Sequence, residues 1–214
     1  MAAVRTRSAY RRRAQDAWVA GAGLAVFLIC ALIAHPGTVG PAERAAFRAI
    51  NGLPEWLYQP MNSVQFLGTL VVGPIVAVVA LVFRKWRLAA AAACATGLKL
   101  LAERWVKLLV QRQRPGTSVP DAILRGNVPP HGLSFVSGHM ILTGTLATIV
   151  TPYLPGRWKV VPWILVAAVG FARIYLGAHN PLDVVGGLGV GLVIGAVLNL
   201  TFGVPATQAR PGGR

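Results

Sequence analysis

Four long runs without Asp, Glu, Lys or Arg constrain the fold of this chain more than any other feature. They cover residues 18–34, 66–83, 132–156 and 184–204, which are 17, 18, 25 and 21 residues long. Since about 20 helical residues cross the ~30 Å hydrocarbon core of a bilayer, each run can form a membrane span. Two more apolar stretches, 88–110 and 160–175, contain the charges Lys99, Glu103, Arg104, Lys107 and Arg173. We therefore expect an all-α bundle of six transmembrane helices.

Basic residues are distributed unevenly around these runs. The chain has 21 Lys and Arg against 6 Asp and Glu, a net charge of +15 at pH 7. With the N-terminus inside, the cytoplasmic ends hold Arg5, Arg7, Arg11, Arg12, Arg13, Arg84, Lys85, Arg87, Arg157, Lys159, Arg210 and Arg214. This excess agrees with the positive-inside rule, so both termini are expected in the cytoplasm. The clusters are too short for the basic face of a nucleic-acid-binding domain, so no nucleic-acid partner is expected.

The expected organisation is a basic cytoplasmic segment at 1–17, a six-span domain at 18–204 and a cytoplasmic tail at 205–214. The protein would be a multi-pass protein of a bacterial plasma membrane. Residues 35–65 are expected to form an interfacial helix and turn, and the Pro- and Gly-rich loop 115–131 a lid. Cys30 and Cys94 fall at different depths, so we expect two buried thiols and no disulfide. No zinc-type Cys and His spacing and no phosphate-binding P-loop occur, so neither metal nor cofactor is expected.

Polar residues converge on one end of the expected bundle. Counting spans from an inside N-terminus brings the following to the outer ends: Lys107, Arg114, Ser137, Gly138, His139, Arg173, His179 and Asp183. Ionisable groups at membrane depth are costly and are functional candidates by default. Arg binds phosphate as a planar fork and Lys as a point charge, and a helix start adds N–H donors. The sequence therefore predicts a phosphate site at the outer face.

The spacing of these residues resembles a known pattern. Lys107 to Pro115 reads K-x6-R-P, Ser137 to His139 reads S-G-H, and Arg173 to Asp183 reads R-x5-H-x3-D. Together they are similar to the three motifs of the type 2 phosphatidic acid phosphatase superfamily, the integral membrane lipid phosphate phosphatases. The resemblance covers roughly residues 65–204. Two positions depart from it, because Val136 stands where the family usually has Pro and Ala172 where it commonly has Ser.

The resemblance implies a metal-independent phosphatase that acts on a lipid phosphate through a phosphohistidine. By motif position His179 would be the nucleophile, Asp183 would orient its ring, and His139 would protonate the departing lipid oxygen. The implied phosphate-binding residues are Lys107, Arg114, Ser137, Gly138 and Arg173.

Several alternatives remain at this stage. The favoured substrate is a polyprenyl (undecaprenyl or decaprenyl) diphosphate; phosphatidic acid, phosphatidylglycerol phosphate and a prenyl-linked sugar phosphate are rivals. The oligomeric state is open. A non-catalytic protein that binds or transports lipid phosphate is the alternative of another class, although pure binding needs the cations more than the two histidines. A vanadate-dependent haloperoxidase is disfavoured by the six spans.

Two side chains are also expected to have structural roles. Asn180 and Pro181 predict a helix start that Asp183 would cap. Lys99, Glu103 and Lys107 share one helix stripe at i, i+4 and i+8, so Glu103 is expected to neutralise Lys99 and position Lys107.

Overall fold

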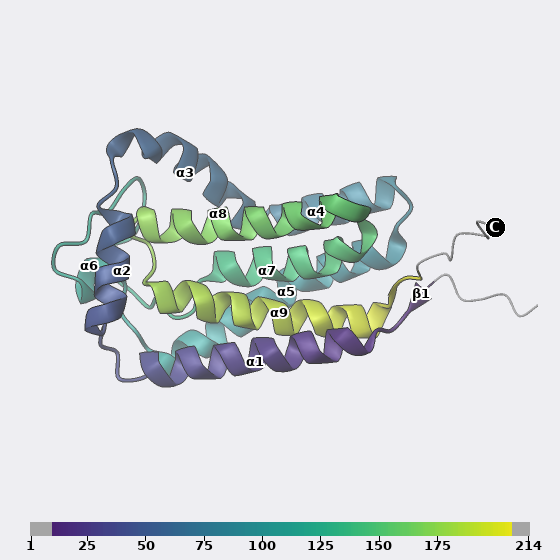
Figure 1. The fold of residues 1–214 in the computed structure, drawn as a ribbon, viewed down its shortest axis with the longest axis horizontal. Helices are drawn as coiled ribbons and strands as arrows, with labels where there is room; N and C mark the ends of the chain where they lie inside the picture. Colours follow the sequence, from purple (N-terminus) through teal and green to yellow (C-terminus); the bar gives the residue numbers. More distant parts are fainter. Residues whose placement is uncertain (1–9, 207–214) are drawn as a thin grey trace, which may run out of the picture.

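The computed structural model describes residues 10–206, so residues 1–9 of the predicted basic segment and 207–214 of the predicted cytoplasmic tail lie outside the described residues. The longer helices lie lengthwise in the molecule (Figure 1): α1 (Ala14–Ala34), α4 (Val72–Val82), α5 (Trp86–Val110), α7 (Gly138–Val150), α8 (Val161–Tyr175) and α9 (Pro181–Phe202). The shorter helices are α2 (Pro41–Asn51), η1 (Glu55–Leu57), α3 (Tyr58–Gln65), η2 (Phe66–Gly68), α6 (Pro115–Ser118), η3 (Thr151–Tyr153) and η4 (Gly156–Val160).

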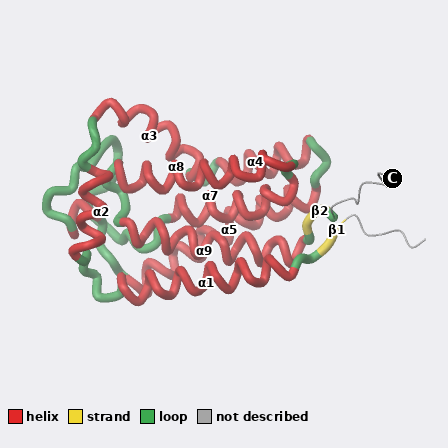
Figure 2. Tube along the Cα trace, in the orientation of Figure 1, coloured by secondary structure: helices red, strands yellow, loops and turns green. Residues whose placement is uncertain are grey.

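The two ends of the molecule differ. α2 crosses one end beside α6 and the long loop after α5 (Figure 1). At the opposite end, β1 (Tyr10–Arg11) pairs antiparallel with β2 (Val204–Pro205), which joins the beginning and the end of the described chain (Figure 2). α9 packs against both α1 and α7, so the last helix lies in the middle of the bundle.

Three helical segments are long and apolar enough to cross a membrane within the described residues, namely α1, residues 156–175 and α9. Residues 55–68 and 72–82 pass the same test only as a pair that is bent by 64°. α5 is longer than any of these but carries charged residues, and α7 has only 13 residues. Much of the apolar surface, including Trp18, Leu32 and Leu109, is exposed, as expected for helices that face lipid.

Two predicted spans differ from the observed helices. The run 66–83 is not one helix, because the chain leaves helical geometry at Thr69 and restarts at Val72, near Gly73 and Pro74. In the run 132–156 the helix begins only at Gly138. The apolar residues just before it, Phe135 and Val136, belong to a loop that is buried in protein and not to a lipid-facing helix.

The segments expected at the interface and the cysteines also have defined places. Residues 35–65 form α2, η1 and α3, which agrees with the predicted helix and turn. Both thiols are free, and Cys30 is buried as expected. Cys94 is exposed, so its predicted packing role is wrong.

Candidate functional site

His179 and Asp183 form the centre of the site. His179 lies in the short connection between α8 and α9, and Asp183 lies in the first turn of α9; both side chains are buried. The His179 Nδ1 atom is 3.7 Å from Asp183 Oδ2, which is longer than a hydrogen bond. The same Oδ2 accepts the Asn180 N–H at 2.8 Å. Asp183 thus caps α9 and faces the imidazole at the same time.

The surroundings of His179 keep its imidazole neutral. Burial lowers the pKa of His179 well below its usual value, and the charges of Arg173, Arg114 and Lys107 lower it further, against a smaller opposite effect of Glu103. Within residues 10–206, His179 Nδ1 has no hydrogen-bond partner. A neutral imidazole near three cations can act as a nucleophile towards an anionic group.

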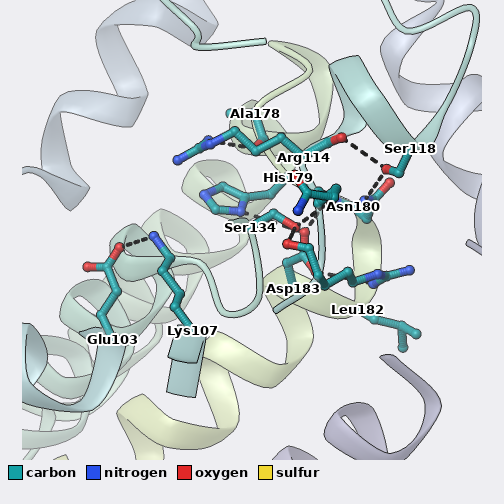
Figure 3. Close-up of polar contacts among 12 residues, drawn as sticks. Glu103, Lys107, Arg114, Ser118, Ser134, Ala178, His179, Asn180, Leu182 and Asp183 are labelled. Carbon is teal, nitrogen blue, oxygen red and sulfur yellow. Dashed lines mark hydrogen bonds and ion pairs between the residues drawn. The ribbon is translucent and has the colours of Figure 1, made fainter. Parts of the chain in front are cut away.

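Two guanidinium groups approach this imidazole from different elements. Arg114 Nη1 donates to the carbonyl of Ala178, the residue before His179, at 3.0 Å (Figure 3). Arg173 donates from Nη1 to the side-chain oxygen of Gln65. Its Nε is buried and makes no hydrogen bond to any described residue. Both side chains therefore keep donors available for an anion.

Lys107 is held by Glu103. Its Nζ lies 2.6 Å from Glu103 Oε1, and Lys99 Nζ lies 2.6 Å from Oε2, so both predicted ion pairs are present. Figure 3 shows Lys107 and Glu103 on one side of His179 and Asp183 on the other. A Cβ atom built on Gly138 would lie 2.2 Å from Glu103 Oε2, so a larger residue there would displace the Glu103 carboxylate. The Glu103 carboxylate therefore lies against the first residue of α7.

Ser137 and His139 lie on either side of Gly138 at the start of α7. The Ser137 backbone N–H donates to the carbonyl of Asp183 at 2.9 Å, which joins the second motif to the third. The Ser137 hydroxyl is buried and has no partner among the described residues. His139 interacts electrostatically with Arg173 and His179. A Cβ atom on Gly68 would lie 2.5 Å from the His139 ring, so the bend between η2 and α4 packs directly on it.

The residues that the sequence singled out thus gather at the end of the molecule that carries α2 and α6. The sequence missed two more charged side chains, Arg112 and Glu43. Arg112 is completely buried and contacts the carboxylates of both Asp183 and Glu43. The available signal was their sequence context: Arg112 stands inside the first motif, and Glu43 is one of only 6 acidic residues in the chain. Across residues 10–206, no cluster of three or more His, Cys, Asp or Glu side chains is arranged to hold a metal ion.

Comparison with known proteins finds one family and relatives that are named as phosphatases. A family model described as the PAP2 superfamily matches residues 84–204. The decaprenylphosphoryl-5-phosphoribose phosphatase of Mycobacterium tuberculosis is 34% identical over 123 residues, which are 56% of this chain and 63% of the relative. The chain thus aligns with less than two thirds of that relative's length. Phosphatidylglycerophosphatase B of Bacillus subtilis is 25% identical over 183 residues, 78% of this chain and 87% of the relative.

Two solved structures share the fold. LpxE of Aquifex aeolicus has a TM-score of 0.66 and 26% identity, covering 72% of this chain and 92% of that one. A transmembrane PAP2-type phosphatidylglycerolphosphate phosphatase of Bacillus subtilis has a TM-score of 0.68 and 22% identity, covering 85% and 94%. The match extends beyond the three motifs to most of the helical bundle.

Proposed function

Because this chain belongs to the PAP2 superfamily, we propose that it is an integral membrane phosphatase that hydrolyses a lipid phosphate through a phosphohistidine. One observation carries the proposal. A buried, neutral imidazole at His179 faces a carboxylate on one side and lies within the field of Lys107, Arg114 and Arg173. A simple anion-binding site has no need of a second histidine, His139, beside the same cations.

The reaction has two steps. The His179 Nε2 lone pair attacks phosphorus, and the bond from phosphorus to the lipid oxygen breaks while His139 donates a proton to that oxygen. A water molecule then attacks the phosphohistidine and gives a proton to His139. The P–N bond breaks, inorganic phosphate leaves, and both histidines return to their starting states. Asp183 stabilises the positive charge that the His179 ring carries between the two steps.

Phosphate would bind to hydrogen-bond donors of the site that have no hydrogen-bond partner among the described residues. The Ser137 hydroxyl and Arg173 Nε are buried without hydrogen bonds to described residues, and both can donate to phosphate oxygens. The N–H groups at the start of α7, including that of Gly138, add the positive end of the helix dipole. Lys107 and Arg114 complete the set. Phosphate has to compete with Glu103 for Lys107, since the carboxylate and the ammonium are 2.6 Å apart.

The hydrocarbon part of the substrate has a place next to His139. An apolar cavity of about 240 Å³ lies between α4, α7 and α8, lined by residues that include Leu67, Val76, Thr143 and Leu165. Leu67 precedes Gly68, which packs on the His139 ring. In the proposed reaction, His139 protonates the oxygen that carries the lipid. A hydrocarbon chain in this cavity would place that leaving oxygen on the His139 side of the phosphate.

The sequence and the names of the relatives favour particular kinds of lipid phosphate as the substrate. The sequence favours a polyprenyl diphosphate. The name of the mycobacterial relative favours a phosphate carried by a prenyl-linked sugar, and that of the Bacillus relative a glycerophospholipid phosphate. We propose a prenyl-linked phosphate as the substrate class, and a panel containing a prenyl diphosphate, a prenyl-linked sugar phosphate, phosphatidic acid and phosphatidylglycerol phosphate tests it. Equal turnover of all four contradicts this narrower proposal.

The membrane arrangement is also part of the proposal. Six spans arise if α5 and α7 cross the membrane beside α1, α4, α8 and α9. The segments that lead into α5 and α8 lie at the end of the bundle that carries β1 (Figure 1), and they contain the basic residues Arg84, Lys85, Arg157 and Lys159. The positive-inside rule makes this end cytoplasmic and the site extracytoplasmic.

Purified protein in detergent provides the decisive assay. We expect phosphate release from a lipid phosphate in excess EDTA, inhibition by vanadate, and a loss of at least about 10³-fold in kcat in His179→Ala. His35→Ala is a matched control, because His35 is exposed and outside the site, and it should retain wild-type turnover. A requirement for a divalent metal would contradict the mechanism. Tight binding of lipid phosphate with no release under any condition would support the non-catalytic alternative.

A further inference from the structure

A completely buried arginine lies behind the catalytic pair. Arg112 Nη1 donates to Asp183 Oδ1 at 3.1 Å and to Glu43 Oε1 at 3.0 Å. Its Nη2 donates to Glu43 Oε2 and, at 3.2 Å, to the carbonyl of Thr38. Arg112 therefore holds the Asp183 oxygen that does not face His179. With Oδ1 fixed in this way, Oδ2, which also accepts the Asn180 N–H, faces the imidazole.

Glu43 reaches the same place from a distant part of the chain. It lies in the first turn of α2, and its Oε1 also accepts the backbone N–H of Leu182 at 2.9 Å. Leu182 immediately precedes Asp183 in α9 (Figure 3). Glu43 thus supports Asp183 twice, once through Arg112 and once through the backbone of the helix start. α2 lies outside the segment matched by the family model, so the motifs do not predict this contact.

The charges of the three groups explain why a second carboxylate is present. Arg112 alone would neutralise Asp183, and a neutral pair would stabilise a positively charged imidazole only weakly. With Glu43 included, one positive charge faces two negative ones and the cluster has a net charge of −1. In a buried site such a charge acts on His179 with little screening. The cluster can therefore stabilise the ring when phosphorus is bonded to Nε2.

We propose that Arg112 and Glu43 are positioning residues for phosphoryl transfer, fixing the Asp183 carboxylate and keeping its side of the imidazole negatively charged. This inference rests on the proposed phosphatase function. Neither residue touches the phosphate, so their effect should appear in kcat rather than in KM. Outer partners that orient a catalytic group typically change activity by about 10- to 100-fold.

Two variants of Glu43 separate the effect of its charge from the effect of its shape. Glu43→Gln keeps an oxygen for the Leu182 N–H but removes the negative charge, and we expect kcat to fall about 10- to 100-fold with KM changed less than about twofold. Glu43→Asp keeps the charge and should recover part of the loss. Arg112→Ala should show the same kcat defect, and added guanidinium ion should restore activity in Arg112→Ala but not in Glu43→Gln.

Arg125 provides a matched control. It is also buried, pairs with Glu55, and donates to the carbonyls of Asn51, Leu53 and Tyr175, so it joins the same end of the bundle without contacting Asp183. Arg125→Ala should lower the thermal unfolding temperature while the folded fraction keeps wild-type kcat. Equal kcat defects in Arg112→Ala and Arg125→Ala, or no rescue by guanidinium, would overturn the positioning role.

The outcome also separates this inference from the function on which it rests. If wild type releases phosphate, His179→Ala does not, and Glu43→Gln turns over normally, the positioning role is wrong and the phosphatase stands. If wild type releases no phosphate from any substrate, both are overturned. Should Arg112→Ala fail to fold, Glu43→Gln and Arg112→Lys still decide the matter, because both preserve most of the buried volume.

Discussion

Acidic side chains are scarce in this chain, and each of the 6 pairs with a cation. The pairs are Asp16 with Arg13, Glu43 and Asp183 with Arg112, Glu55 with Arg125, Glu103 with Lys99 and Lys107, and Asp121 with Arg48. An unpaired carboxylate is expensive at low dielectric, so a membrane protein retains few of them. Half of these residues, Glu43, Glu103 and Asp183, lie in or directly behind the candidate site.

The lowered pKa of His179 predicts that kcat/KM falls at an unusually low pH on the acid side of its pH profile. At pH 6 an ordinary histidine of pKa ~6.5 is only about one quarter neutral, whereas His179 should remain neutral and able to attack. The acid limb of kcat/KM that belongs to His179 should therefore lie well below pH ~6.5. A pH–rate profile, with NMR titration of the labelled imidazole in the free enzyme, measures it. A His179 titration near pH ~6.5 would contradict the burial argument.

The lowered pKa of His179 also affects the stability of the folded protein, which should decrease in acid. Below pH ~6.5 the unfolded chain binds a proton at this histidine that the folded protein does not, so unfolding becomes easier as the pH falls. The low pKa that keeps the His179 imidazole neutral thus lowers the stability of the folded protein in acid.

The resemblance to the three motifs identifies their residues, because the members of each motif lie close together in the sequence. It does not identify Glu43, which meets Arg112 across 69 positions of sequence. Arg112 stands inside the first motif, but it also falls in an expected outer loop with other cations, and this context does not show that the arginine is buried. Long-range ion pairs of this kind become visible only when the chain is folded.

At the scale of elements, hydropathy predicts where apolar segments lie but not where helices begin. Uncharged runs cannot distinguish a lipid-facing helix from an apolar loop buried in protein, as at Phe135 and Val136. The interruption near Thr69 had a signal in Gly68, Gly73 and Pro74, which break a continuous helix. Val136 directly precedes Ser137, and Gly68 packs on the His139 ring, so irregular backbone next to the site is covered by protein.

The cavity between α4, α7 and α8 gives a prediction at this scale. Val76→Trp should fill it and raise KM for a long-chain lipid phosphate; excluding about two methylene groups at ~0.8 kcal/mol each corresponds to roughly a tenfold effect. A short-chain, water-soluble phosphate should be hydrolysed as by wild type. Val78→Trp is the control, because Val78 is on the same helix, is 58% exposed and does not line the cavity. Equal KM changes for long and short substrates would mean that the chain lies elsewhere.

At the scale of the whole molecule, the proposed orientation can be measured directly. Ala42→Cys lies at the end with the site, and Lys159→Cys at the end with β1 and β2, both at exposed positions in a background with Cys30 and Cys94 changed to Ala. A membrane-impermeant maleimide should label the first variant in intact cells and the second only after permeabilisation. The reverse pattern would show an inward-facing site.

The bend beside Gly68 has one more consequence. Because the chain turns by 64° there, the same short segment borders both the His139 ring and the apolar cavity. Water and hydrocarbon would thus meet close to His139, the proposed general acid. Under the proposed function, a lipid would present its headgroup for hydrolysis while its tail stays dissolved in the bilayer, and the enzyme would never have to extract its substrate from the membrane.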